Sequence, residues 1–138
     1  MKKITLTLLA TAAAATALLM NPHDVTAQEK TAPKAAANPY RHIVLFKFKD
    51  NAPAEKVKAI VEAFKALPAK LPAIKALEWG TNVSPEGLNQ GFTHCFALTF
   101  ADKEALEKHY LHEPAHKEFG AMLGGVLDKA LVVDFVAQ

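Results

Sequence analysis

The sequence predicts a small α+β domain over residues 40–138, and two kinds of hydrophobic periodicity predict it. Stretches in which every second residue is apolar are typical of β-strands, whereas apolar residues three or four apart mark one face of an α-helix. Both patterns occur here and follow one another along the chain, separated by prolines and glycines. The chain has no internal repeat, so a single domain is expected.

The first predicted strand, Arg41–Lys49, has two substantially apolar faces and is followed by the first predicted helix. Asn51-Ala52-Pro53 is expected to start this helix, because proline is favoured in a first helical turn. Pro68 is expected to end it. The apolar stripe of the helix consists of Val57, Ile60, Val61, Phe64 and Leu67.

The second and third strands are predicted at Leu77–Val83 and Phe92–Phe100. Residues 84–91 between them include one proline and two glycines and are expected to form a loop. The third strand shows the clearest alternation of the chain. One of its sides carries Phe92, His94, Phe96, Leu98 and Phe100, and the other carries Thr93, Cys95, Ala97 and Thr99.

The last part of the domain is predicted to hold two helical segments and a strand. Asp102 suits the N-cap of the first segment, and Pro114 can begin the second. Gly124-Gly125 is expected to end the second segment, before a short strand at Ala130–Val136. The resulting order, β-α-β-β-α-β, is that of the ferredoxin-like fold, an antiparallel four-stranded sheet with helices on one face.

Two helices can cover only one face of a four-stranded sheet. The other face would present mostly small or aliphatic side chains, namely Ile43, Leu45, Cys95 and Ala97. Such a surface suits a second sheet stacked about 10 Å away. We therefore predict a homodimer closed sheet to sheet, that is, a dimeric α+β barrel. A partly solvated face with scattered apolar residues is the alternative.

Residues 1–27 have the layout of a secretory signal peptide. Two lysines precede the uncharged run Ile4–Met20, and small residues favour cleavage after Ala27. An uncleaved membrane anchor is the alternative, but the apolar run is shorter than the roughly 20 residues that a spanning helix needs. Residues 28–39, with two prolines and no large apolar residue, are expected to be a flexible linker. We expect export to the periplasm or the cell exterior, with no membrane attachment after cleavage.

Composition and spacing exclude several kinds of site. A formal net charge of +2 is too small to indicate binding to nucleic acid. The sequence has one cysteine, Cys95, which cannot form an internal disulfide. His109, His112 and His116 have helical spacing, but Pro114 interrupts the helix and no Asp, Glu or Cys joins them with the spacing of a metal ligand. We therefore predict no metal and no cofactor.

Four polar side chains are expected to converge on an apolar space between the sheet and the helices. His42 and His94 lie on the helix-facing sides of their strands, and Tyr110 and His116 point inward from the helical segments. Phe46, Phe96 and Phe119 would form the walls. Apolar walls with a few convergent polar groups are typical of a pocket for a small apolar or aromatic ligand. Core histidines that merely satisfy one another's hydrogen bonds are the alternative.

Five runs of this sequence resemble the stress-responsive dimeric α/β-barrel family, often called Dabb. They are RHIVLFKFKD (41–50), Trp79-Gly80, THCFALTF (93–100), HYLHEPAHKEF (109–119) and VVDF (132–135). The resemblance covers about residues 41–136. The His-Glu-Pro-Ala-His segment, His112 to His116, has one residue more between its first histidine and the proline than the family pattern.

The resemblance implies a ferredoxin-like monomer that pairs into a barrel. Some members, the plant polyketide (olivetolic acid) cyclases, close a linear polyketide by aldol condensation without a cofactor, with a histidine as base and a tyrosine assisting. By position, those roles would fall to His116 and Tyr110, with His42 and His94 lining the pocket. Two functions stay open: binding of a small apolar or carbonyl-bearing ligand, and a cofactor-free lyase or cyclase. A haem or oxidative role, known among distant barrel relatives, is a third.

Overall fold

The computed structural model describes residues 38–138. The predicted signal peptide, residues 1–27, and most of the predicted linker lie outside the described residues. The elements in chain order are β1 (Tyr40–Phe48), α1 (Ala54–Lys65), α2 (Leu67–Lys70), β2 (Ala76–Thr81), β3 (His94–Phe100), α3 (Lys103–His109), α4 (Pro114–Met122) and β4 (Leu127–Val136).

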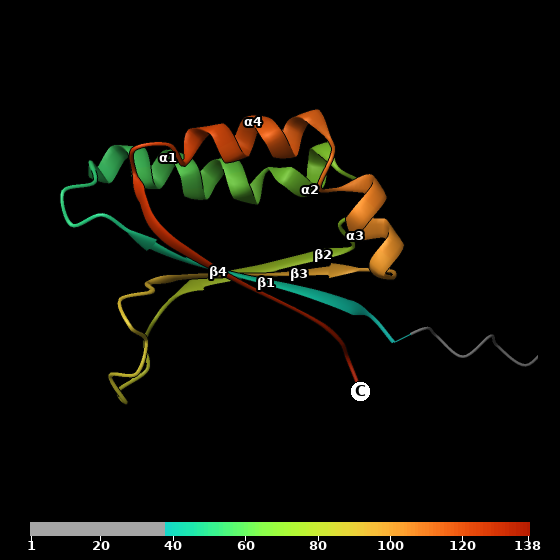
Figure 1. The fold of residues 1–138 in the computed structure, drawn as a ribbon, viewed down its shortest axis with the longest axis horizontal. Coiled ribbons are helices and arrows are strands. Elements are labelled where there is room, and N and C mark those ends of the chain that lie inside the picture. The colour runs from blue at the N-terminus through green and yellow to red at the C-terminus, as the bar shows by residue number, and fades with distance from the viewer. Residues whose placement is uncertain (1–37) are drawn as a thin grey trace, which may run out of the picture. The chain divides into compact units, whose positions relative to one another are not determined.

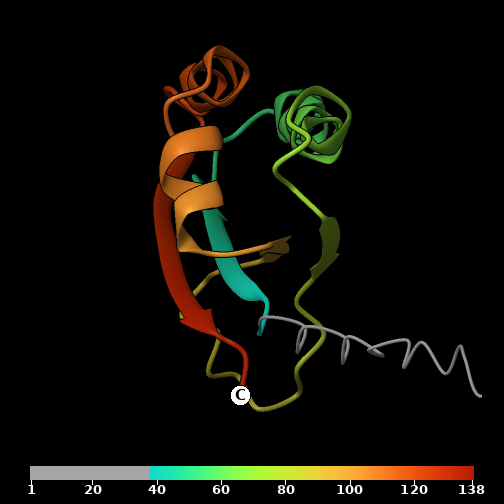
Figure 2. The same ribbon diagram turned by 90° about the vertical axis from the view of Figure 1, so that its right-hand side faces the viewer.

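The four strands form one antiparallel sheet in the order β2-β3-β1-β4. In both views α1 and α4 lie together on one face of this sheet (Figure 1, Figure 2). This arrangement confirms the predicted ferredoxin-like fold. None of the helices within residues 38–138 is long and apolar enough to cross a membrane.

Some predicted boundaries were wrong. Pro68 does not end the first helix: α1 ends at Lys65, and Pro68 is the second residue of α2. A proline in the first turn removes no intrahelical hydrogen bond, because those N–H groups have no helical acceptor. β4 begins at Leu127 rather than Ala130, since its pairing with β1 continues at Lys129 and, after a register shift at Asp128, at Leu127. Val83 lies outside β2 and is 89% exposed.

Two predicted helix starts are confirmed. The Oδ1 atom of Asp102 accepts a hydrogen bond of 2.8 Å from the backbone N–H of Ala105, which caps α3. Pro114 is the first residue of α4, where its fixed φ fits the helix. Pro114 thus marks the end of the short turn between α3 and α4, next to Tyr110 and His116 of the candidate site.

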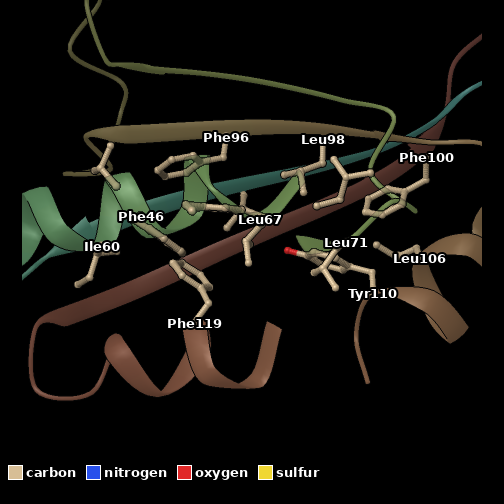
Figure 3. Close-up of a cluster of buried hydrophobic side chains, with 14 of the residues drawn as sticks. Phe46, Ile60, Leu67, Leu71, Phe96, Leu98, Phe100, Leu106, Tyr110 and Phe119 are labelled. Carbon is tan, nitrogen blue, oxygen red and sulfur yellow. The ribbon is translucent and has the colours of Figure 1, made fainter. Parts of the chain in front are cut away.

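The hydrophobic core lies between the sheet and the helices, and an aromatic cluster forms one end of it. Phe119 from α4 lies near Phe46 from β1 and Phe96 from β3 (Figure 3), and Phe64 from α1 packs against all three rings. The ring centroid of Phe64 lies 4.0 Å from that of Phe96 and 4.8 Å from that of Phe119. Burial of each ring contributes roughly 1.5–3 kcal/mol, so the cluster fixes how α4 sits over the sheet.

The face of the sheet opposite the helices is more apolar than the sequence predicted. Leu131, Val133 and Phe135 of β4 lie on this face, and they are 45%, 47% and 47% exposed. Two of them are register partners of Leu45 and Ile43, which are only half-buried. The edge strand thus widens the apolar surface beyond the four residues expected from the sequence.

Candidate functional site

A cavity of about 390 Å³, here named the α4–β4 cavity, lies between the helices and the β4 side of the sheet. Residues from β1, β4, α1, α4 and the end of α3 line it. Two of them, Val132 and Leu111, are 50% and 36% exposed, which places the mouth of the cavity beside β4. Val132 faces the helices and the adjacent Val133 faces away from them, so cavity and open sheet face lie on opposite sides of one strand.

His42 and Asp134, which both line this cavity, form a hydrogen-bonded pair. His42 is 5% exposed on the helix-facing side of β1, and its Nδ1 lies 2.6 Å from Oδ1 of Asp134 on β4. An ionised carboxylate can only accept a hydrogen bond, so Nδ1 of His42 carries the proton. The Nε2 atom of the neutral ring is then the one that can accept a proton.

His116 is held in the same tautomer by a different partner. It lies in the first turns of α4, and its Nδ1 is 3.3 Å from the backbone carbonyl oxygen of Leu111. Because a carbonyl only accepts, Nδ1 donates and Nε2 is free. Burial lowers the pKa of His116; the Leu111 carbonyl opposes this shift, and the nearby His42 adds to it. His116 is therefore neutral at pH 7 and able to act as a base.

Tyr110 stands next to both histidines. Its ring centroid lies 5.6 Å from that of His42 and 4.4 Å from that of His116. The side chain is 1% exposed, and burial raises its pKa far above the usual value, so the hydroxyl stays protonated. That hydroxyl makes none of the side-chain hydrogen bonds found within residues 38–138, and Figure 3 shows its oxygen directed into the space between the sheet and α4.

The polar groups occupy only one end of the cavity. His42 and Phe46 lie on the same side of β1, four residues apart, which corresponds to roughly 13 Å along a strand. Phe46 packs with Phe64 and Phe119, and all three line the cavity. The site therefore has a titratable end formed by His42, Asp134, Tyr110 and His116, and an aromatic end.

Five of the seven predicted site residues line this cavity: His42, Phe46, Tyr110, His116 and Phe119. The other two, His94 and Phe96, do not, and the predicted convergence of four polar groups is corrected to three. His94 is the register partner of Phe46, not of His42, because β1 and β3 run antiparallel. Its ring packs on Phe48 and it borders a second cavity of about 360 Å³ beside the 82–93 loop. Phe96 is fully buried behind the aromatic end.

Asp134 lines the candidate site and pairs with His42, and reasoning from sequence missed it. It is the only charged residue between Lys129 and the end of β4, in an otherwise apolar stretch. That isolated carboxylate was a usable signal, since a charge on a helix-facing strand position needs a partner. Within residues 38–138, no group of three or more His, Cys, Asp or Glu side chains is placed to hold a metal ion.

Comparison with known proteins relates this chain to a family. The family model described as the stress responsive A/B barrel domain, Dabb, matches residues 40–137. The chain is 41% identical to the stress-response A/B barrel domain-containing protein HS1 of Arabidopsis thaliana over 100 residues, which are 72% of this chain and 91% of that protein. It is 28% identical to the olivetolic acid cyclase of Cannabis sativa over 98 residues, 71% of this chain and 96% of the cyclase.

A solved structure has the same ferredoxin-like fold. A dimeric protein of ferredoxin-like fold from Bacteroides fragilis, of unknown function, superimposes with a TM-score of 0.59 at 28% identity and covers 72% of this chain and 96% of its own. Its description as a dimer applies to that protein. Because the family model spans the whole domain from β1 to β4, the chain belongs to the stress responsive A/B barrel domain family.

Proposed function

We propose that the α4–β4 cavity binds a small, mainly apolar organic compound that carries a carbonyl group. The observation that carries this proposal is the position of Tyr110, whose ring stands beside those of His42 and His116 in the lining of a cavity with aromatic walls. A carbonyl oxygen is an acceptor and fits a fixed hydroxyl donor, whereas an anionic ligand would meet the Asp134 carboxylate. The apolar part of the ligand would lie against Phe46 and Phe119.

A second candidate, proton transfer on that ligand, is favoured by the two histidine tautomers. Both rings donate from Nδ1, so each has a free Nε2. In this proposal Nε2 of His116 accepts a proton from the carbon next to the carbonyl. The C–H electron pair forms a carbon–carbon double bond, and the π pair of the carbonyl moves onto its oxygen to give an enolate. The Tyr110 hydroxyl donates to that oxygen. The enolate carbon then forms a bond to a second carbonyl carbon of the same molecule, and His116 returns the proton to the new alkoxide.

Similarity to a cyclase supports this second candidate, since the match to the cyclase of Cannabis sativa extends over 98 residues and 96% of the cyclase. The reaction needs no redox partner, because one proton leaves and the same proton returns. His42, oriented by Asp134, would either hold the substrate carbonyl when protonated or act as a second base when neutral.

One experiment tests both candidates. The full chain is incubated with a panel of ketones and β-diketones with alkyl or aryl substituents, and binding is measured by ligand-observed NMR. Product masses are then measured in the same samples. Binding with an unchanged ligand mass supports the ligand-binding function alone, and conversion supports the lyase or cyclase function. If no member of the panel binds at millimolar concentration, the proposed function is wrong.

The assembly and the location of the protein are part of the same proposal. We propose a homodimer built from the open face of the sheet, supported by the exposed side chains of Leu131, Val133 and Phe135 and by dimeric relatives.

We also propose that residues 1–27 direct export and are removed, on the basis of their sequence layout. N-terminal sequencing of the protein recovered from outside the cytoplasm should then begin at Gln28; an intact Met1 would contradict removal.

A further inference from the structure

The open face of the sheet carries small side chains toward one edge and large ones at the other. On this face lie Gly80, Cys95 and Ala97 of β2 and β3, and Leu131, Val133 and Phe135 of β4. β2 and β4 are the two edge strands of the sheet, and α1 and α4 lie on its opposite face (Figure 1). The layer of side chains on the open face is therefore thin at the β2 edge and thick at the β4 edge.

This gradient in side-chain size distinguishes between two possible dimers. A two-fold axis relates the copies of a closed homodimer, so every contact between them occurs twice. When two aligned sheets are stacked face to face, an axis along the strands places β4 of one copy over β2 of the other. An axis across the strands places β4 over β4 and β2 over β2. Only the first arrangement sets each thick edge against a thin one, so shape complementarity favours β4 over β2.

Gly80 lies on β2 at a position where one copy by itself has no need for glycine. A Cβ atom built on Gly80 would have no neighbour within 4 Å, and its φ is not in the positive region. Neither crowding within one copy nor backbone conformation therefore accounts for this residue. Glycine inside a strand weakens the strand and often marks a place where another group approaches the backbone closely.

The open space at Gly80 belongs to the cavity of about 360 Å³ beside the 82–93 loop, which Cys95 and Leu45 also line. Gly80, Cys95, Leu45 and Leu131 form one row of register partners across the sheet, from β2 to β4. A two-fold axis along the strands keeps each such row at the same level in both copies. Leu131 of a second copy then lies over Gly80, with its side chain directed toward this cavity.

The charged residues of the open face favour the same arrangement. Glu78 is exposed on this face and takes part in none of the ion pairs within residues 38–138. An axis along the strands brings Arg41 of the second copy over β3, next to Glu78. An axis across the strands instead brings the two Glu78 carboxylates toward each other. Opposite charges on facing positions stabilise a contact, and like charges destabilise it.

We infer that β4 of each copy packs over β2 and β3 of the other, with Leu131 inserted into the cavity at Gly80 and Cys95 of the second copy. This inference rests on the proposed homodimer and adds which strands meet. The occupant of the cavity beside the 82–93 loop is thus a side chain of a second copy of this chain.

The test uses full-length single-thiol variants, made in a Cys95→Ala background because Cys95 is the only native cysteine. Gly80→Cys and Leu131→Cys proteins are mixed, allowed to exchange subunits and treated with a short bis-maleimide. The mixture should give at least about tenfold more covalent dimer than either variant alone, because only Gly80 and Leu131 of different copies face each other. Denaturing gel electrophoresis measures the yield, and mass spectrometry of the joined peptides identifies the two positions.

A second pair of variants provides the matched control. Ala76→Cys and Phe135→Cys lie at the two ends of another row of register partners, so their mixture should also give covalent dimer. This pair also provides the answer if Gly80→Cys does not fold. A mixture of Ala76→Cys with Leu131→Cys should give little, because position 76 and position 131 belong to rows about 13 Å apart along the strands.

The possible failures separate from one another. A wild-type protein that is monomeric in sedimentation velocity overturns the proposed homodimer and this inference with it. A dimeric wild type whose Leu131→Cys variant crosslinks to itself has β4 over β4, which overturns the inferred arrangement and leaves the homodimer intact. A dimeric wild type in which neither matched mixture crosslinks overturns the arrangement as well.

Discussion

The Nδ1 atom of His42 lies 2.6 Å from a carboxylate oxygen of Asp134, and the two residues are direct register partners on β1 and β4. Residues that face each other in an antiparallel pair bring their Cβ atoms to within about 5.5 Å, so the sheet itself fixes this contact. The carboxylate holds the imidazole in one tautomer and compensates a buried polar ring. The pair is thus a structural element and a part of the site at once.

Removal of the Asp134 carboxylate should destabilise the domain. Asp134→Ala leaves the buried Nδ1 of His42 without a partner and should lower the free energy of unfolding by about 1–3 kcal/mol, measured by urea denaturation. Asp134→Asn keeps an acceptor oxygen, so its free energy of unfolding should fall by less than that of Asp134→Ala. Asp128→Ala is the control: that residue pairs with Lys47 on the same two strands but is exposed, and its loss should cost at most about 1 kcal/mol. Equal losses for the two alanine variants would contradict a special role for Asp134.

The Tyr110 hydroxyl should matter for ligand binding and not for folding. Tyr110→Phe keeps the buried ring and removes an oxygen that bonds to no other side chain in the described domain, so the melting temperature should change little. Binding of a carbonyl ligand should weaken about 2- to 12-fold, the loss of one neutral hydrogen bond. Titrations with a ketone and with an alkane of equal length check this, because only the ketone should respond to the substitution. A matched loss for both ligands would show a packing effect instead.

His116 should be the base if the site is catalytic. His116→Ala removes Nε2 and should lower turnover of a converted ligand by about 10²- to 10⁴-fold, with the fold retained, since the ring is only half-buried. His112→Ala, an exposed histidine of the preceding turn, is the matched control and should keep full activity. Turnover is measured as product mass over time. Persistent turnover in His116→Ala would leave His42 as the remaining base.

Stability should decrease on mild acidification, because burial lowers the pKa of both His94 and His116 in the folded chain. An unfolded histidine titrates near pH 6.5, so below that pH the unfolded chain binds more protons than the folded one. The free energy of unfolding should therefore fall from about pH 6.5 downward, until the pH reaches the lower folded values. Urea denaturation at several pH values from 7.5 to 5 measures this fall.

The contribution of His116 to that pH dependence can be isolated. His116→Gln removes one of the two shifted groups, so its free energy of unfolding should fall less over the same pH range than that of the wild type. His112→Gln removes an exposed ring and should keep the wild-type dependence. Parallel curves for the wild type and His116→Gln would mean that the folded protein binds the His116 proton as readily as the unfolded chain does.

Substitutions at two neighbouring residues of β4 should affect dimer formation and ligand binding separately. Val133→Asp places a charge on the open face of the sheet and should raise the dimer dissociation constant by at least about 100-fold. Val132→Asp places the same charge on the helix-facing side, where it should weaken ligand binding and leave the dimer intact. Sedimentation velocity measures the assembly of both variants. If both remain dimeric, the dimer does not use this face of the sheet.

Local pattern was sufficient for much of the fold. The element order was predicted from signals that each arise within a few residues of chain. These signals are the alternation in residues 92–100, the helical stripe that ends at Phe64 and Leu67, the N-cap Asp102, and Pro114 at the start of α4. The same alternation placed His42 on the helix-facing side and Ile43 on the open one. The boundary at Pro68 was wrong because a proline can end one helix or begin the next, and its neighbours along the chain do not decide which.

Only the tertiary structure decided which of these side chains meet. His42 and Asp134 are 92 residues apart and come together through the register of β1 with β4. The register of β1 with β3 instead sets His94 opposite Phe46, about 13 Å from His42 along the strand. The sequence by itself determined which face each residue occupies, since a period of two is local. The sheet order and the antiparallel registers determined the site, because they are properties of long-range pairing that no short stretch of the chain contains.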